Sequence, residues 1–240
     1  MDSGLGQADS NMRLLLFDID GTLVNTGGAG SGAMTRAFSK VCGIEDAFGG
    51  LSMAGMTDPL ILDHAIDIAE KNGRRMTFTH EEIYDCYLQF LSEELNSGRN
   101  HYQVLPGVVG TLEELAGRDD LVLGLATGNI ADGARVKLEH GNIYHYFGFG
   151  GYGSDHHDRT FVVQQAVRRG REYVAPATVT RSIVIGDTPR DVIHARKAGA
   201  EVIAVASGSH NREILEALEP DLMLDSLEDR ESFMGFLGLS

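Results

Sequence analysis

Carboxylate and hydroxyl side chains follow three short apolar runs of this 240-residue chain. Asp18 and Asp20 come after the first run, Thr127 after the second and Asp187 after the third. If the runs are parallel strands of one sheet, their carboxyl ends share an edge, where open α/β sheets bind ligands. A single Asp at a strand end is most often a helix cap, but three carboxylates at one edge are costly unless a cation neutralises them. Because carboxylate oxygens are the natural ligands of hard cations, the pattern predicts a site for a hard cation such as Mg²⁺.

The elements that must position these side chains alternate along the chain. Continuous apolar runs at 13–18, 121–126, 182–186 and 201–206 are typical of strands buried on both faces of a parallel sheet. Each is followed by a Gly-containing turn and a helical pattern, for example at 191–198 and 211–218. This alternation indicates βαβ units. We therefore expect an α/β fold with a Rossmann-like, doubly wound parallel sheet.

The stretch between the first two runs has a different pattern. Amphipathic helices are expected at 30–41, 58–72 and 79–95, with no strand candidate of comparable quality between them. Asp58-Pro59 predicts an N-cap followed by Pro, and Thr79 with Glu82 forms a capping-box pattern. We expect an α/β core domain at 12–26 and 104–240, an inserted helical cap domain at 27–103 and a flexible tail at 1–11.

Charge and composition narrow the possible partners. The chain has 20 Lys and Arg against 35 Asp and Glu, a net charge of −15, which argues against a nucleic-acid partner. No apolar run is long enough to span a bilayer, and the polar start lacks the pattern of a secretion signal. Cys42 and Cys86 do not have a metal-binding or redox spacing. We therefore expect a cytoplasmic protein with no membrane partner and no disulfide scaffold.

Four sequence signatures resemble those of the haloacid dehalogenase superfamily. They occur in the expected order: D-x-D-G-T from Asp18, A-T-G-N around Thr127, the basic residue Arg159, and G-D-T-P-R-D from Gly186 to Asp191. The resemblance covers essentially the whole chain, including the helical cap, and is closest to members similar to phosphoglycolate phosphatase and β-phosphoglucomutase.

The resemblance implies a role for each acid. Asp18 would be the nucleophile and form an aspartyl-phosphate. Asp20 would protonate the leaving oxygen and then deprotonate the attacking water. Mg²⁺ would be held by Asp18, the backbone carbonyl of Asp20, and Asp187, and would offset the repulsion between carboxylates and phosphate.

The phosphoryl group would be bound by the later signatures. Thr127 would donate its hydroxyl, helped by backbone N–H groups at Gly128 and Asn129. Arg159 stands where the family usually has Lys, and its forked guanidinium can reach both a carboxylate and a phosphoryl oxygen. Asp191 is assigned a supporting role, bridging to metal-bound water or to the basic residue; the alternative is a simple helix-start acid. Two later arginines in the following helix are fallback candidates, Arg168 and Arg169.

Three other features are interpreted as structural. The glycine-rich stretch 27–32 lacks a nucleotide-loop ending and is expected to be a hinge between core and cap. Residues 148–153 approximate a dinucleotide fingerprint but are expected to form a loop. His156 and His157 are expected to be loop histidines, because no further ligand pair is suitably spaced.

The resemblance implies a Mg²⁺-dependent phosphatase that acts on a small phosphorylated metabolite, either phosphoglycolate-like or a sugar phosphate. A sugar phosphomutase of the same superfamily is the alternative, because it shares the whole site. A non-catalytic binding module is disfavoured, because such a chain would be expected to have lost one of its acids. Met56 stands where phosphoglycolate phosphatases often carry a basic residue, and Asn25 where many relatives have Asp. Both departures argue against phosphoglycolate itself.

Overall fold

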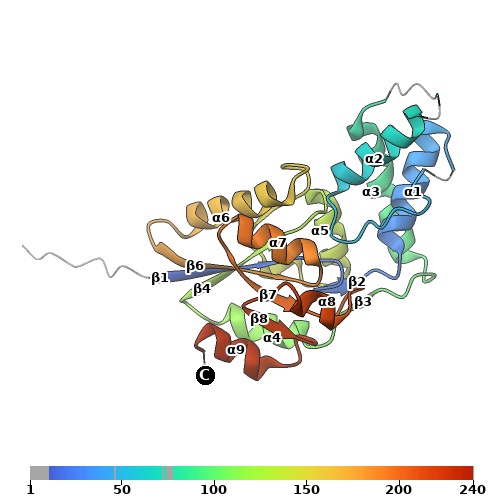
Figure 1. The fold of residues 1–240 in the computed structure, drawn as a ribbon. Helices are drawn as coiled ribbons and strands as arrows, with labels where there is room; N and C mark the ends of the chain where they lie inside the picture. Colours follow the sequence, from blue (N-terminus) through green and yellow to red (C-terminus); the bar gives the residue numbers. More distant parts are fainter. Residues whose placement is uncertain (1–10, 46, 72, 74–77, 240) are drawn as a thin grey trace, which may run out of the picture.

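The computed structural model describes residues 11–239 except 46, 72 and 74–77. Its centre is a six-stranded sheet in the order β5-β4-β1-β6-β7-β8, in which all neighbouring pairs are parallel (Figure 1). The predicted α/β fold with a helical insert is confirmed. The strands are β1 (Asn11–Phe17), β4 (Leu121–Ala126), β5 (Phe149–Gly151), β6 (Thr178–Gly186), β7 (Glu201–Val205) and β8 (Leu222–Leu224).

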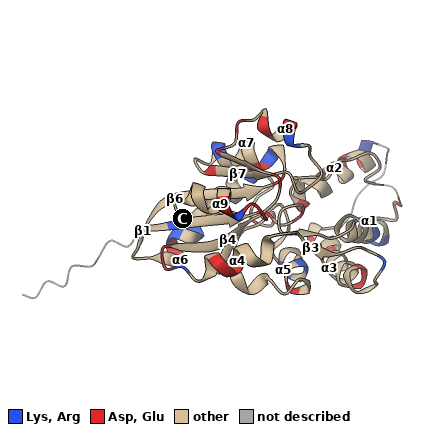
Figure 2. Cartoon of the chain, turned by 90° about the horizontal axis from the view of Figure 1, so that it is seen from below, with Lys and Arg blue, Asp and Glu red and all other residues tan. Residues whose placement is uncertain are grey.

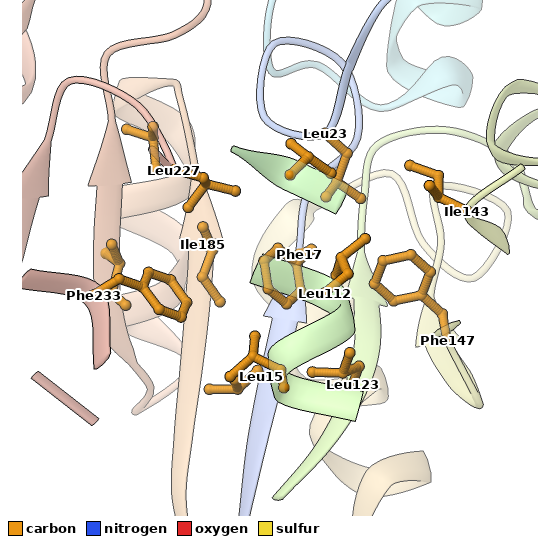
Figure 3. Close-up of a cluster of buried hydrophobic side chains, with 14 of the residues drawn as sticks. Leu15, Phe17, Leu23, Leu112, Leu123, Ile143, Phe147, Ile185, Leu227 and Phe233 are labelled. Atoms are coloured by element: carbon orange, nitrogen blue, oxygen red, sulfur yellow. The ribbon is translucent and has the colours of Figure 1, made fainter. Parts of the chain in front are cut away.

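The central strand β1 is buried on both faces, as its continuous apolar run predicts. Leu14 and Leu16 point to one face of the sheet, and Leu15 and Phe17 to the other, because successive side chains of a strand alternate. Figure 3 shows the second face, where Phe17 lies close to Phe147, with ring centroids 5.9 Å apart. The chain adds β4 on one side of β1 and later β6 on the other, so the topology reverses at β1.

Helices cover both faces of this sheet. The face carrying Phe17 packs against α4 (Val108–Ala116), α5 (Ala131–His140) and α9 (Arg230–Leu237). The opposite face packs against α6 (Arg159–Val174), α7 (Pro189–Lys197) and α8 (Arg212–Glu216). A short 3-10 helix, η1 (Tyr144–Tyr146), precedes β5. The result is a three-layer core whose strand ends remain open to a ligand.

The helical insert forms a separate cap next to the core (Figure 1). It comprises α1 (Ala29–Cys42), α2 (Asp58–Lys71) and α3 (His80–Asn96). The chain leaves the core through β2 (Val24–Asn25) and returns through β3 (Gln103–Val104), and these two strands pair antiparallel. The cap has its own apolar cluster, which includes Phe38, Leu62 and Leu91. The predicted capping box of α3 is confirmed: the Thr79 hydroxyl accepts from the Glu82 N–H, and the Glu82 carboxylate accepts from the Thr79 N–H.

Two local predictions were wrong. The stretch 148–153, expected as a loop, contains the edge strand β5, which pairs with β4. A three-residue strand is too short to show a hydrophobic period. Asp58 does not cap its own helix: its carboxylate instead accepts a hydrogen bond from the Ile130 N–H at 2.8 Å. The hydroxyl of Thr57 lies 3.4 Å from the Leu60 N–H and takes that place. Of the predicted tail at 1–11, only Asn11 lies within the described residues, where it begins β1.

Charged residues occur along the helices of both core and cap, with acidic and basic residues interspersed (Figure 2). None of the helices in the described part of the chain is long and apolar enough to cross a membrane.

Candidate active site

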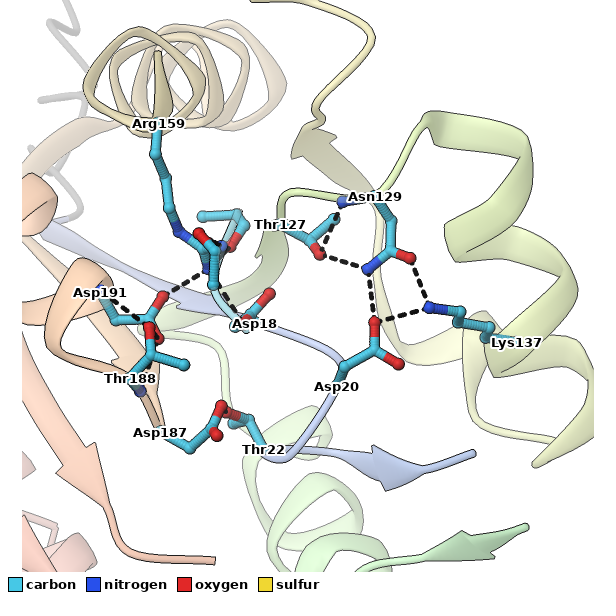
Figure 4. A network of polar contacts seen from close by, with 12 residues as sticks. Asp18, Asp20, Thr22, Thr127, Asn129, Lys137, Arg159, Asp187, Thr188 and Asp191 are labelled. Atoms are coloured by element: carbon cyan, nitrogen blue, oxygen red, sulfur yellow. Dashed lines mark hydrogen bonds and ion pairs between the residues drawn. The ribbon is translucent and has the colours of Figure 1, made fainter. Parts of the chain in front are cut away.

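A pocket of about 390 Å³ lies at the carboxyl ends of the strands, between core and cap. Asp18 follows β1 and Asp187 follows β6, the strand paired with it, and both carboxylates line the cavity. Thr127 follows β4, on the other side of β1, and is fully buried. The reversal of topology at β1 therefore brings together the three strand ends that carry the sequence-predicted residues (Figure 4).

Arg159, the first residue of α6, is buried and joins two carboxylates. Its guanidinium lies 3.0 Å from Asp18 Oδ2 and also contacts Asp191 Oδ1. Burial raises the pKa of Asp18 to about 6, although the charge of Arg159 opposes this. The third partner of Arg159 belongs to the cap, where the carbonyl of Gly55 accepts at 3.2 Å. The guanidinium thus contacts both the Asp18 carboxylate in the core and the backbone of the cap.

Asp187 has no cation of its own among the described residues in hydrogen-bond range. Its Oδ1 accepts from the Thr22 hydroxyl at 3.1 Å. Burial and the neighbouring charges of Asp191 and Asp18 raise its pKa well above the ordinary value. The loops press closely on it, because a Cβ at Gly208 would lie 1.7 Å from Asp187 Oδ2. A buried carboxylate in this state is stabilised by a bound cation.

The acids Asp18, Asp187 and Asp191 form a cluster that could hold a metal ion, with one oxygen of each within 4.8 Å of the others. Asp191, however, already has partners for both oxygens. Its Oδ2 accepts from the N–H and the hydroxyl of Thr188, in the capping box of α7, and its Oδ1 contacts Arg159. Asp191 is therefore both a helix-start acid and a bridge to the basic residue, the two alternatives considered from the sequence. Asp18 and Asp187 are better placed to be ligands.

The second acid of the D-x-D pair lies in a different network. Asp20 Oδ2 accepts from the Asn129 amide at 2.8 Å and from the Lys137 ammonium at 2.6 Å. Asn129 also donates to the Thr127 hydroxyl at 2.9 Å and accepts from Lys137 at 2.6 Å. The side chain of Asp20 remains 43% exposed at the pocket, whereas that of Lys137 is 5% exposed. The network (Figure 4) holds one oxygen of Asp20 and leaves the other for chemistry.

Sequence reasoning missed Lys137. Its signal lay in the period of α5, where Ala134 and Leu138 form the buried face and Lys137 shares it. A lysine in an apolar register is seldom buried without a partner. No local pattern names that partner, because Asp20 is 117 positions away in the chain.

Several hydrogen bonds between described residues join the cap to the core. Besides the Gly55–Arg159 contact, the Asp58 N–H donates to the Gly128 carbonyl at 2.8 Å, and the Thr57 hydroxyl donates to the His157 carbonyl at 2.8 Å. The Asp58 carboxylate accepts from the Ile130 N–H. Gly128 is required here by close approach, since a Cβ would lie 2.2 Å from the Met56 carbonyl oxygen.

The remaining candidates lie outside the site. Arg168 is exposed and pairs with Glu172, and Arg169 pairs with Asp155. His156 stacks on His157, with ring centroids 4.4 Å apart, and its Nδ1 accepts from the Asp158 N–H. Neither histidine belongs to a metal-type cluster of the described residues.

Comparison with known proteins agrees with this architecture. The family model of haloacid dehalogenase-like hydrolases matches residues 15–205. The pyrophosphatase PpaX of Oceanobacillus iheyensis is 21% identical over 94% of this chain and 98% of its own. A phosphoglycolate phosphatase of Photorhabdus laumondii is 23% identical over 95% of this chain and 94% of its own. A crystal structure of a predicted phosphoglycolate phosphatase from Haemophilus somnus has a TM-score of 0.63 and 20% identity, covering 95% of this chain and all of that one.

The chain belongs to the haloacid dehalogenase-like hydrolase family. The predicted family is confirmed, and so is the prediction of an enzyme of the phosphatase type.

Proposed function

We propose that this chain is a Mg²⁺-dependent phosphatase that hydrolyses a small phosphorylated organic compound through an aspartyl-phosphate at Asp18. The observation that carries the proposal is the pairing of a buried Asp18 with Arg159 at 3.0 Å, beside the uncompensated Asp187. The names of the relatives include phosphoglycolate phosphatase and pyrophosphatase, and they support phosphoryl chemistry without choosing a substrate.

The donor set fits a hard divalent cation. Asp18 and Asp187 are buried carboxylates, and burial together with the neighbouring acids raises the pKa of each, so a cation bound between them would stabilise their ionised forms. In the proposal these two carboxylates and the backbone carbonyl of Asp20 would hold Mg²⁺. When bound, Mg²⁺ would neutralise charge that develops on the phosphoryl group.

The chain's own residues would carry out two displacements. The Asp18 carboxylate attacks phosphorus, so that an Asp18 oxygen–phosphorus bond forms while the bond to the leaving oxygen breaks. Asp20 gives the leaving oxygen a proton and later takes one from the water that hydrolyses the intermediate. Because Oδ2 of Asp20 accepts from Lys137 and Asn129, the transferred proton would be carried on Oδ1.

The phosphoryl oxygens would be bound by Arg159, by the Thr127 hydroxyl and by backbone N–H groups at Gly128 and Asn129. Arg159 is supported in this role by its contact with the nucleophile. Thr127 is oriented by Asn129, whose amide donates to its hydroxyl oxygen and leaves the Thr127 proton for another acceptor.

Hydrolysis of p-nitrophenyl phosphate by wild type and Asp18→Asn, with Mg²⁺ and with EDTA, tests this function. Turnover should require both Mg²⁺ and the Asp18 carboxylate. Asp67→Asn, an exposed change of the same type on α2, is the matched control and should retain full activity. Undiminished activity of Asp18→Asn, or activity that survives EDTA, would refute the mechanism.

A further inference from the structure

The part of the pocket wall contributed by the cap carries no basic side chain among the described residues. The cap residues that face the cavity are mainly apolar, with one acid: Met34, Met53, Met56, Ile61, Tyr87 and Asp58. In the proposed reaction the core binds the phosphoryl group, so this wall faces the leaving group. Among the described residues, this wall offers no cation that could pair with a carboxylate or a second phosphate.

In the described part of the chain, the cations that line the pocket are Arg159 and Lys137; both come from the core, and both are already paired. Arg159 contacts Asp18 and Asp191, and its side chain is 4% exposed. Lys137 is 2.6 Å from Asp20 Oδ2 and 2.6 Å from Asn129 Oδ1. If either cation turned toward an anionic leaving group, it would leave a carboxylate without its partner, which is costly in a buried site.

The formal charges of the pocket leave no excess of positive charge that could bind an anionic leaving group. Counted over the described residues, four carboxylates line it, Asp18, Asp20, Asp58 and Asp187, against the two cations Arg159 and Lys137. A divalent cation would bring the lining to formal balance before the phosphoryl group adds about two negative charges. Asp58 projects from the cap wall itself, held by the Ile130 N–H, and would repel an anion there.

We propose, on the basis of the phosphatase function above, that the pocket selects phosphate monoesters of uncharged alcohols. The carbon skeleton of the alcohol packs against Met34, Met53 and Met56, whose flexible thioethers adapt to irregular shapes. The alcohol hydroxyls can hydrogen-bond to Ser31 and Asp58, which also line the cavity. Compounds with an anionic leaving group, such as phosphoglycolate and pyrophosphate, are disfavoured.

The test compares kcat/KM of the Mg²⁺-loaded wild type for 2-hydroxyethyl phosphate and 2-phosphoglycolate. These esters have the same two-carbon skeleton and differ in a terminal hydroxyl against a carboxylate. The uncharged ester should be preferred by at least about tenfold, and pyrophosphate should also be a poor substrate. Equal values, or a preference for 2-phosphoglycolate or pyrophosphate, would overturn the inference.

A charge added to the cap wall should reverse the discrimination. Met53 lines the pocket and is only partly buried, so the fold should tolerate Met53→Lys, which places a cation facing the leaving group. The ratio of the two kcat/KM values should shift toward 2-phosphoglycolate by about tenfold. Ile214→Lys adds the same charge at an exposed position of α8 outside the pocket and should leave the ratio unchanged. A ratio that does not respond to Met53→Lys would count against the proposed wall.

Calorimetric binding of the two esters to Asp18→Asn with Mg²⁺ separates this inference from the proposed function. Tighter binding of 2-hydroxyethyl phosphate supports the inference, whether or not wild type shows turnover. An absence of turnover would count against the proposed phosphatase function alone. Equal or tighter binding of 2-phosphoglycolate overturns the inference and leaves the phosphatase standing. Failure of both esters to bind overturns the inference, whereas the proposed function is still decided by the p-nitrophenyl phosphate assay.

Discussion

The Lys137 ammonium lies 2.6 Å from Asp20 Oδ2, so a buried lysine of α5 holds the acid expected to exchange protons with the substrate. Without Lys137, the Asp20 carboxylate would lose its cationic partner and keep the neutral Asn129 amide as a hydrogen-bond donor. The pair also joins the loop after β1 to α5, which packs against α3 of the cap. Positioning of Asp20 thus depends on an element outside the four family signatures.

Lys137→Met should lower kcat by about tenfold or more, because Asp20 loses the contact that orients it. In an Asp20→Asn background the same change should cost much less, since the two residues act as a unit. Steady-state kinetics of the two single variants and the double variant measure this coupling. Lys197→Met, an exposed change on α7, is the matched control. Additive losses would show that Lys137 has only a structural role.

Arg159→Met should destabilise the fold by about 3 kcal/mol, because it leaves the Asp18 and Asp191 carboxylates buried without their cation. Activity should fall as well, and Arg159→Lys should be intermediate, since an ammonium cannot span both carboxylates and the Gly55 carbonyl. Urea unfolding of the metal-free protein measures the free energy. Arg168→Met, exposed on the same helix, should cost little. An unchanged free energy of unfolding in Arg159→Met would contradict the buried pairing.

Stabilisation by Mg²⁺ should be larger at about pH 7.5 than at about pH 5. The pKa of Asp18 is raised to about 6, so protons compete with the cation below that pH and the affinity for Mg²⁺ rises as pH increases through it. In the metal-free protein the sign is opposite: the native state binds the extra proton, so stability falls as pH rises from about 4 to about 6. Thermal melts with Mg²⁺ and with EDTA at both pH values check this. A Mg²⁺ effect independent of pH would argue against Asp18 as a ligand.

Between pH 4 and pH 8, Asp58→Asn should gain stability relative to wild type by up to about 3 kcal/mol. Burial raises the pKa of Asp58 from 3.8 to about 6. The stability of wild type therefore falls as pH rises between these two values, because the buried group must ionise. Asparagine cannot ionise and can still accept from the Ile130 N–H. Chemical unfolding as a function of pH measures the difference. Asp67→Asn, exposed on the same helix, should show no such trend, and a parallel profile for Asp58→Asn would refute the prediction.

The sheet and the acids at its edge could be predicted from the sequence because their signals are local. The run 13–18 is apolar from Leu14 to Phe17 and ends in Asp18, which is the pattern of a strand buried on both faces. Parallel strands end at a common edge, so the position of Asp18 and Asp187 at the ends of two such runs was enough to bring them together. The capping box at Thr79 and Glu82 was visible for the same reason, since its partners are three residues apart.

Tertiary structure decided what local patterns cannot encode. A helix-start acid has the same sequence context whether it caps its own helix or, like Asp58, reaches across to Ile130 in the core. The partners of Lys137 and the proximity of β5 to β4 depend on how distant segments pack. The sequence by itself determined the fold class and which acids share the sheet edge. Packing decided which cations contact those acids, and it made the cap side of the pocket mainly apolar. The partners of a charged side chain depend on the three-dimensional arrangement of its neighbours and not on its position in the chain.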